Sequence, residues 1–484
     1  MIAFKQKATN TVAIICLIIA TFLLSIAAYK AHTASFTHDE SYTYNHYVNS
    51  SLKTTVLFLD NPTANNHILN TLLMAVFSRI FGNSELALRL PNLIAYLFFL
   101  LFTFKILDRA IANRILVVIS FIIINCNPFL IDFFSLARGY GITVFLTTAS
   151  LYFLLTFSET SKTKHYTYSL LFALLATYSN ISSLYFLCGI IIAYNIFILI
   201  DFTGDWKTTI RYIIQKNKIS LIFSALTFST LAWPIFTLSK HNQFYFGGEN
   251  NFWSDTIISL IHSTLYGNYY NGYGEKTLIA LSTITLLSIV LILWRAQAKN
   301  KILLIVYLIG GIIITINTHH YTLGSKLIIG RTALFLIPLS TIYFCFVLHW
   351  ISNTEKLKFL AYTIGITIAI TAISHTTNSY SFEKYANWDY DKNSKEVINL
   401  LENEAKNHTQ GNIVLGINWL FEPTLNFYIK TRKLNWIDKV NRDGINDKQD
   451  YYYIFESDTI QLNEIRYKVI RRFNDTNTIL AKKI

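Results

Sequence analysis

Two adjacent carboxylates follow the first apolar run of the chain, in the sequence HDESYTY at 38–44. Asp39 could act as a general base toward an acceptor hydroxyl, because low-dielectric surroundings and the neighbouring Glu40 would tune its pKa. Adjacent carboxylates at a membrane surface are costly unless they are solvated, paired or functional. The alternative is an ordinary helix start, with Thr37 or Asp39 as the cap. The spacing alone leaves both interpretations open.

Three arginines lie where apolar runs begin. Arg89 lies in LALRLPN, Arg138 lies in ARGY, and Arg331 follows HHYTLGSKLIIG, which contains Lys326. A guanidinium suits an anionic ligand because its paired N–H donors match phosphate oxygens. The four cations are therefore predicted to bind a phosphate or diphosphate. The alternative for each arginine is that it snorkels to the membrane interface.

Further polar and aromatic residues in the same stretches extend the predicted site. Asp132 is either a second catalytic carboxylate or the structural partner of an arginine. His67, Glu249 and Trp253 are predicted to line an acceptor or sugar pocket, in which Trp253 could stack on a sugar ring. Solvated histidines and an interfacial aromatic belt are the alternatives. No HxxxH or similar spacing supports a metal site.

The elements that position these residues are apolar runs long enough to be membrane helices. Eleven spans are predicted, near 11–29, 86–105, 115–131, 139–157, 166–178, 183–200, 219–238, 277–294, 302–317, 332–350 and 359–376. The run 66–81 is short and carries Arg79. If it does not cross, every predicted cytoplasmic loop is basic, as the positive-inside rule requires. The run is therefore predicted to lie on the outer surface, with the N-terminus inside and the C-terminus outside.

This topology places all the candidate residues on one side of the membrane. The outer loops are predicted at 30–85, 132–138, 239–276 and 318–331. Residues 1–377 form the predicted membrane domain. Residues 378–484 hold 31 of the 69 charged residues and are predicted to form a small extracytoplasmic α/β domain. In that domain we expect helices near 394–406 and 419–430 and strands near 412–416, 451–456 and 465–473.

Charge and motif content exclude several classes of protein. The net charge of +13 lies in short loops between apolar runs, where it sets orientation, so nucleic acid is not a predicted partner. All four cysteines fall in apolar runs, so no disulfide is implied. No Walker A loop, GxGxxG after a strand, GxSxG elbow or cytoplasmic DxD is present, which leaves nucleotide-driven transport and nucleotide-sugar chemistry unsupported.

The order of motifs resembles a known family. A basic N-terminus and one span precede HDESYTY, NPTANNHILN, FGNSELALRLPNLIAYLFF and NPFLIDFFSLARGY, and a soluble C-terminal region follows. This pattern is similar to the GT-C glycosyltransferases, specifically the bacterial relatives of protein O-mannosyltransferases and of the aminoarabinose transferase that acts on lipid A. The motif match covers roughly residues 1–160, and beyond them the likeness is one of topology.

The resemblance implies a polytopic enzyme of the bacterial inner membrane with its active site and C-terminal domain in the periplasm. It implies a polyprenyl-phosphate-linked sugar donor, a lipid, glycan or protein acceptor, and inversion at the anomeric carbon. Asp39 takes the role of the acidic residue of the first outer loop, with Glu40 beside it. Asn65-Asn66-His67 stands where members often have His-Pro-Pro. Members differ in their need for a divalent metal, so that requirement stays open.

Two other functions compete with this expectation. A lipid-linked oligosaccharide polymerase or ligase would rest on a large outer loop late in the chain, without an acidic pair after the first span. A flippase or transporter would carry charged residues deep inside its spans. The charged residues here cluster at the ends of the predicted spans. The sequence therefore favours a transferase.

Overall fold

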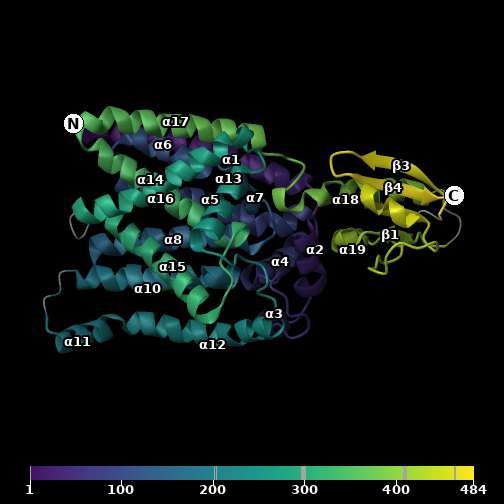
Figure 1. Cartoon of the computed structure of the whole chain (residues 1–484), viewed down its shortest axis with the longest axis horizontal. Coiled ribbons are helices and arrows are strands. Elements are labelled where there is room, and N and C mark those ends of the chain that lie inside the picture. Colours follow the sequence, from purple (N-terminus) through teal and green to yellow (C-terminus); the bar gives the residue numbers. More distant parts are fainter. Residues whose placement is uncertain (1, 201, 203, 296–300, 407–410, 463–464) are drawn as a thin grey trace. The chain divides into compact units, whose positions relative to one another are not determined.

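The computed structural model describes residues 2–200, 202, 204–295, 301–406, 411–462 and 465–484, and these are predominantly helical (Figure 1). The chain divides into two compact units, each discontinuous in sequence. We call the first the bundle unit, which comprises Met1–Ala27, Val56–Asn70 and Pro91–Tyr380. We call the second the sheet unit, which comprises Ala28–Thr55, Thr71–Leu90 and Ser381–Ile484. The predicted membrane domain therefore contributes two segments to the unit that holds the C-terminal region.

The helices up to residue 380 vary widely in length. They are α1 (Ile2–Thr33), α2 (His38–Thr43), α3 (Leu52–Leu57), α4 (Ile68–Phe81), α5 (Glu85–Ala110), α6 (Arg114–Asn125), α7 (Pro128–Phe134), α8 (Gly139–Thr160), α9 (Thr163–Ser179), α10 (Leu184–Leu199), α11 (Trp206–Lys216), α12 (Lys218–Lys240), α13 (Ile258–Leu265), α14 (Tyr273–Arg295), α15 (Lys301–Leu323), α16 (Leu336–Ser352) and α17 (Glu355–Ser379). Short π- and 3₁₀-helical turns lie between several of them, including η3 (Phe252–Ile257) and η5 (Gly330–Ala333).

Eight helices in the described part of the chain are long and apolar enough to cross a membrane, and the bent pair α6–α7 would make a ninth. Two further apolar helices, α4 and α16, are shorter. The 14 residues of α4 span only about 21 Å at 1.5 Å each, less than a hydrocarbon core of about 30 Å. The prediction of a mainly helical, polytopic membrane protein is confirmed. The count of eleven spans and their orientation stay predictions.

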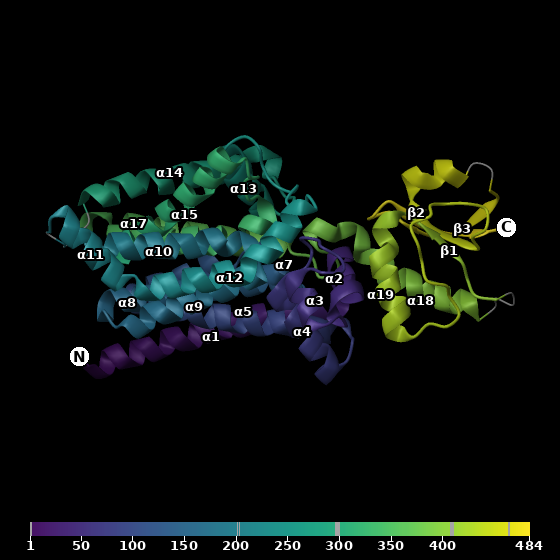
Figure 2. The same ribbon diagram turned by 90° about the horizontal axis from the view of Figure 1, so that it is seen from below.

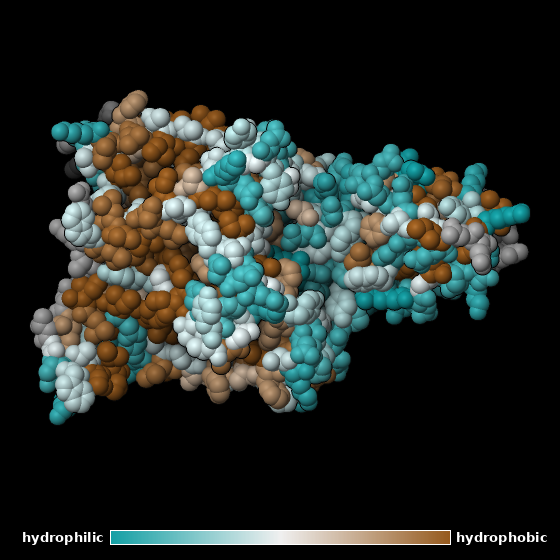
Figure 3. Space-filling view, in the orientation of Figure 1, coloured by the Kyte–Doolittle hydropathy of each residue, from teal (hydrophilic) through white to brown (hydrophobic). Residues whose placement is uncertain are grey.

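Apolar side chains cover much of the helical bundle on the face shown in Figure 3, where they form broad brown areas. On α14, Leu287 and Val290 are 64% and 67% exposed, and on α17 Ile370 is 62% exposed. Soluble proteins rarely expose such continuous apolar surface. These faces are therefore the surface that lipid would cover.

Small residues allow the inner helices to pack closely. Helix α8 packs on α9, α9 on α10 and α10 on α15. Figure 2 labels all four among the long helices of the bundle. A Cβ built on Gly189 in α10 would lie 2.6 Å from the side chain of Ile312 in α15. Between α8 and α9, Ser150 donates to the Ser169 carbonyl at 2.7 Å. Close approach and hydrogen bonds of this kind stabilise helix pairs where no water competes.

The predicted span at 115–131 is a broken helix. Helices α6 and α7 meet at an angle of 70°. Asn127 caps α7 by accepting a hydrogen bond from the Leu130 amide at 3.0 Å, and Pro128 occupies its first turn. A proline favours the start of a helix because it has no N–H to lose there. The break turns α7 and brings Asp132 onto a short separate element.

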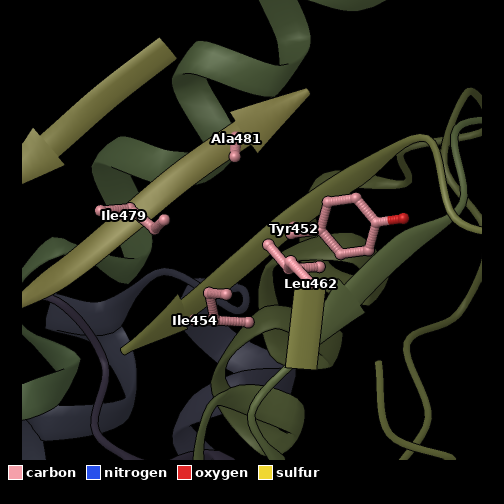
Figure 4. Packing of buried hydrophobic residues seen from close by; sticks show 5 residues of the cluster. All are labelled: Tyr452, Ile454, Leu462, Ile479 and Ala481. Carbon is pink, nitrogen blue, oxygen red and sulfur yellow. The ribbon is translucent and has the colours of Figure 1, made fainter. Parts of the chain in front are cut away.

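The sheet unit contains a four-stranded sheet of order β1-β2-β4-β3. Its elements are α18 (Ser394–Ala405), β1 (Leu415–Ile417), α19 (Glu422–Arg432), β2 (Tyr451–Phe455), β3 (Tyr467–Phe473) and β4 (Thr478–Lys483), with the turns η6 (Ala386–Asn393) and η7 (Trp419–Phe421). Strand β1 pairs with β2 in parallel, and β2–β4 and β4–β3 are antiparallel. Tyr452, Ile454, Leu462, Ile479 and Ala481 form a buried cluster (Figure 4).

The secondary structure expected after residue 378 agrees with this arrangement except at one strand. Helices α18 and α19 and strands β1, β2 and β3 lie at or next to their predicted positions. Strand β4 is not predicted, because its sequence TILAKK is short and ends in two lysines. It lies between β2 and β3 and is buried over its first four residues. The prediction of a small α/β C-terminal region is confirmed.

Candidate active site

The predicted site residues divide between the two units. Asp39, Glu40 and Arg89 belong to the sheet unit. The bundle unit contains His67, Asp132, Arg138, Glu249, Trp253, Lys326 and Arg331.

Asp39 and Glu40 occupy the first turn of the short helix α2. Glu40 accepts hydrogen bonds from the Thr37 amide at 2.9 Å and from the Thr37 hydroxyl at 3.0 Å, which close the start of the helix. Glu40 is fully buried, whereas Asp39 is partly exposed. The capping that was the alternative for Asp39 is thus performed by Thr37 and Glu40. Of the two carboxylates, Asp39 is the one that a substrate could reach.

Arg89 is fully buried and donates five hydrogen bonds within the sheet unit. Its Nε and Nη2 bind the two carboxylate oxygens of Glu40 at 2.8 and 2.7 Å. Its Nη1 and Nη2 also donate to the carbonyls of Ala31, Ala34 and Ser35, at 3.1, 2.9 and 2.8 Å. A guanidinium has five N–H donors, so this set uses them all. The geometry favours a structural role for Arg89 and Glu40 over the predicted roles in phosphate binding and catalysis.

Aromatic rings enclose the same guanidinium. The Arg89 Cζ lies 5.1 Å from the centre of the Phe36 ring and 5.2 Å from that of Tyr385. The buried Lys30 ammonium lies 4.3 Å from the centre of the Tyr385 ring. Cation–π attraction is strongest where water is absent. These contacts fix the segment before α2 to the start of α5 and to Tyr385.

In the bundle unit, His67 is buried and lies close to two of the predicted phosphate-binding arginines. Its Nδ1 donates to the Ser179 carbonyl at 2.8 Å. Burial, then the charge of Arg138 and more weakly that of Arg331, hold the pKa of His67 well below its ordinary value. The ring is therefore neutral with its proton on Nδ1, and Nε2 is an acceptor. Nε2 is buried and has no hydrogen-bond partner among the described residues.

Arg138 is the N-cap residue of α8 and is 1% exposed. Its Nη1 donates to the Asn65 carbonyl at 2.8 Å. Packing requires a glycine at the next position, Gly139. A Cβ there would lie 1.9 Å from the Ser179 carbonyl oxygen and 2.8 Å from the His67 side chain. The ARGY motif thus places an arginine beside His67 at a point where the backbone passes very closely.

Asp132 is buried on α7 and accepts a hydrogen bond from the Tyr266 hydroxyl. This bond connects the broken helix to the loop after α13. Nearby, Asn92 donates to Asn70 at 2.9 Å, and Asn70 donates to the Ala137 carbonyl at 2.9 Å. The contact shown for Asp132 is with a tyrosine and not with the arginine that the sequence offered as its structural partner, and a catalytic role for Asp132 stays a prediction.

The two late loops of the bundle unit are joined to each other. Gly248 and Leu327 exchange backbone hydrogen bonds of 2.9 and 2.8 Å, and Lys326 forms an ion pair with Glu249. The Arg331 Cζ lies 5.1 Å from the centre of the Phe246 ring. Glu249 and Lys326 therefore neutralise one another, although the sequence predicted separate roles for them. Trp253 lies in η3, partly exposed.

Metal binding has no support in the described part of the chain. Within it, no three His, Cys, Asp or Glu side chains come together in an arrangement that could hold a metal ion. The metal requirement, which the sequence left open, therefore gains no candidate ligands.

Comparison with known proteins gives a match in fold and none in sequence. No protein-family model matches the chain, and no curated protein matches it in sequence. The solved structure of ArnT from Cupriavidus metallidurans bound to undecaprenyl phosphate matches with 10% identity, 97% coverage of both chains and a TM-score of 0.53. The apo state of the same protein matches with 10% identity, coverage of 96% of this chain and 97% of that chain, and a TM-score of 0.52.

The chain has the GT-C fold. The likeness extends over almost the whole length, well beyond the first 160 residues in which the motifs carry the resemblance. It shows how the chain is folded, and at 10% identity the chemistry must be argued from the residues themselves.

Several residues that contact the predicted site residues were not themselves predicted from the sequence. Asp391, Tyr385 and Tyr428 contact α2 or the residues before it, which include Lys30, from positions more than 300 residues later. Tyr266 reaches Asp132 across 134 residues. A signal was present for one of them, since Tyr266 begins the tyrosine-rich run up to Tyr273.

Proposed function

We propose that the chain is an inverting glycosyltransferase that moves a sugar from a polyprenyl-phosphate donor to an acceptor hydroxyl at the periplasmic face of a bacterial inner membrane. The observation that carries this proposal is the likeness in fold to ArnT over 97% of both chains, because that ArnT structure holds undecaprenyl phosphate. The polar clusters described above lie among the loops that the charge rule assigns to the outer side.

The proposed reaction is a single displacement. The acceptor hydroxyl oxygen attacks the anomeric carbon, the bond from that carbon to the phosphate oxygen breaks, and the phosphate leaves with the electron pair. Asp39 takes the proton of the hydroxyl as general base, since it is the partly exposed carboxylate of the pair on α2. Attack from the face opposite the leaving group inverts the anomeric carbon.

Arg138 and Arg331 are proposed to stabilise the charge that develops on the leaving phosphate. Their support is that the buried Arg138 donates to the Asn65 carbonyl, two residues before His67, and that the charges of both arginines lower the pKa of this histidine. His67 is proposed to accept a hydrogen bond from a sugar hydroxyl through Nε2. Trp253 is proposed to stack on a sugar ring. Lys326 is held by Glu249, so its predicted contact with phosphate would require that pair to open.

The proposal is tested by transfer of radiolabelled sugar from polyprenyl-phosphate donors to membrane acceptors by the purified chain in lipid. Asp39→Asn removes the base while keeping the side-chain shape, and its expected effect is a loss of about 100- to 10,000-fold in turnover. The matched control is Asp443→Asn, which changes an exposed carboxylate in the same unit and is expected to retain full activity. Full activity in Asp39→Asn would rule out Asp39 as the base.

The competing functions give different outcomes in the same preparation. A polymerase or ligase would transfer preassembled oligosaccharides and not single sugars. A flippase would move labelled lipid across the bilayer without forming a glycosidic bond. Detection of a new glycosidic bond from a single-sugar donor separates the proposed transferase from both.

A further inference from the structure

The residues that hold α2 in place come from the C-terminal segment of the sheet unit. Asp391 in η6 is 1% exposed. Its Oδ2 accepts a hydrogen bond from the His38 amide at 2.5 Å. Its Oδ1 accepts from the Thr424 hydroxyl at 3.0 Å and from the Ser394 hydroxyl at 3.4 Å. This carboxyl therefore connects the residue before Asp39 to α18 and α19.

Contacts on both sides of Asp39 lead to the same region. The His38 Nδ1 donates to the Leu420 carbonyl at 2.7 Å, and the Phe36 amide donates to the Tyr428 hydroxyl at 2.9 Å. The Phe36 ring stacks on Phe427 with centres 4.2 Å apart. Beyond the helix, the Asn45 side chain donates to the Pro423 carbonyl at 2.9 Å.

These contacts are needed because α2 cannot hold itself. It has only six residues, and a helix of that length is unstable alone because nucleation costs more than its few hydrogen bonds return. A buried carboxyl such as that of Asp391 is also costly unless its hydrogen bonds compensate. Burial raises the pKa of Asp391 well above its ordinary value, with the charge of Asp39 adding in the same direction. A costly group placed at this point suggests that it fixes the adjacent helix.

We propose that the region 381–484 orients the catalytic helix, with Asp391 as the positioning residue that holds Asp39 at the reacting hydroxyl. The inference rests on the proposed function of Asp39 and extends it. It gives the C-terminal region a task other than binding substrate. The distance from the base to the hydroxyl then depends on a residue that does not touch substrate, and an error of about 1 Å in such a distance can lower a rate about 100-fold.

Two substitutions of Asp391 test the proposal in the full-length chain. Asp391→Ala removes the acceptor of the His38 amide, and turnover is expected to fall about 10- to 100-fold with the donor KM within about twofold of wild type. Asp391→Asn keeps an acceptor oxygen and is expected to restore turnover to within about threefold of wild type.

The matched control is Gln449→Ala, which removes a buried polar side chain of the same unit that bonds to Gly444 and Asn446. It is expected to lower the thermal midpoint without changing turnover. Full turnover in Asp391→Ala, or an equal loss in Gln449→Ala, would overturn the proposal. So would a failure of Asp391→Asn to restore activity.

Hydrogen exchange separates a failure of this inference from a failure of the proposed function. If wild type transfers no sugar, the proposed function fails, and the positioning is then judged from amide exchange over residues 36–48. Faster exchange of these amides in Asp391→Ala and not in Gln449→Ala supports the proposal that Asp391 fixes α2 in position. Unchanged exchange in Asp391→Ala contradicts it.

Discussion

At the scale of single residues, the Glu40–Arg89 pair shows how buried charged side chains can be tolerated in a folded membrane protein. Both side chains have no exposed surface, and each charged oxygen or N–H faces a partner. Removing two charges from water costs several kcal/mol each, and only complete hydrogen bonding with good geometry compensates. The pair therefore fixes two segments of the sheet unit, one before α2 and one at the start of α5.

Loss of one partner of this pair should be severe. Glu40→Gln leaves the Arg89 guanidinium buried without a counter-charge, and the free energy of unfolding is expected to fall by about 3–5 kcal/mol. The measurement is the thermal midpoint of the purified chain in detergent. Glu159→Gln is the control, because Glu159 pairs with Arg109 at a partly exposed site where about 1 kcal/mol or less is expected. Equal losses in the two variants would contradict the structural role of Glu40.

Asp391 gives a prediction for pH. Because its folded pKa is raised by burial, the folded chain binds this proton more tightly than the unfolded chain does. Its contribution to stability is complete below the ordinary carboxyl range near pH 4, and it is lost as the pH rises through the folded pKa. In a pH series of thermal midpoints, wild type should lose stability relative to Asp391→Asn as the pH rises. Parallel curves for the two proteins would contradict the assignment.

At the scale of elements, the start of α8 depends on glycine. A Cβ at Gly139 would meet the Ser179 carbonyl at 1.9 Å, so α8 must move away from His67. Gly139→Ala is expected to destabilise the chain by about 3 kcal/mol and to lower transfer activity. Gly310→Ala in α15 is the control, because nothing lies within 4 Å of the new Cβ and a gain of up to about 1 kcal/mol is expected. The readouts are folded yield and thermal midpoint, and equal values for both variants would contradict the packing argument.

Helices and strands were predictable where the residues of the segment itself determine its secondary structure. The long apolar runs predict the helices of the bundle, and alternating or continuous apolar stretches predict β2 and β3. The break between α6 and α7 was missed because the apolar run continues through Asn127-Pro128, although that pair is a helix-start signal. Strand β4 was missed because its pairing with β2 and β3, and not its own sequence, makes it a strand.

In the candidate site too, features that depend on local sequence were predicted, and features that depend on tertiary contacts were not. Asp39 was predicted as a site residue because an acidic pair after an apolar run is unusual. The partner of Arg89 was not predicted, since nothing local tells a phosphate-binding arginine from one whose five donors are met by Glu40 and three carbonyls. Contacts such as His38 with Asp391 join residues 353 apart, and their pairing depends on the complete fold.

At the scale of the whole molecule, the topology is the main open prediction. The basic loops predict that the N-terminus lies inside and the C-terminus outside. A phosphatase that is active only outside the cytoplasm, fused after Ile484, should be active. The same fusion placed after Lys164, in a predicted inner loop, should be inactive. Activity in the second fusion and not in the first would invert the predicted orientation.

The contacts that hold α2 also determine when this helix can become ordered in a newly made chain. Residues 36–45 leave the ribosome early, yet their partners lie in η6, η7 and α19, at residues 391–428. Translation at about 5–20 residues per second separates the two by roughly 20–70 s. Throughout this interval α2 lacks the contacts that order it. On the proposed role of Asp39, the first membrane helices of a nascent chain can form well before the base is held in place, and transfer cannot begin until residues 391–428 have been made.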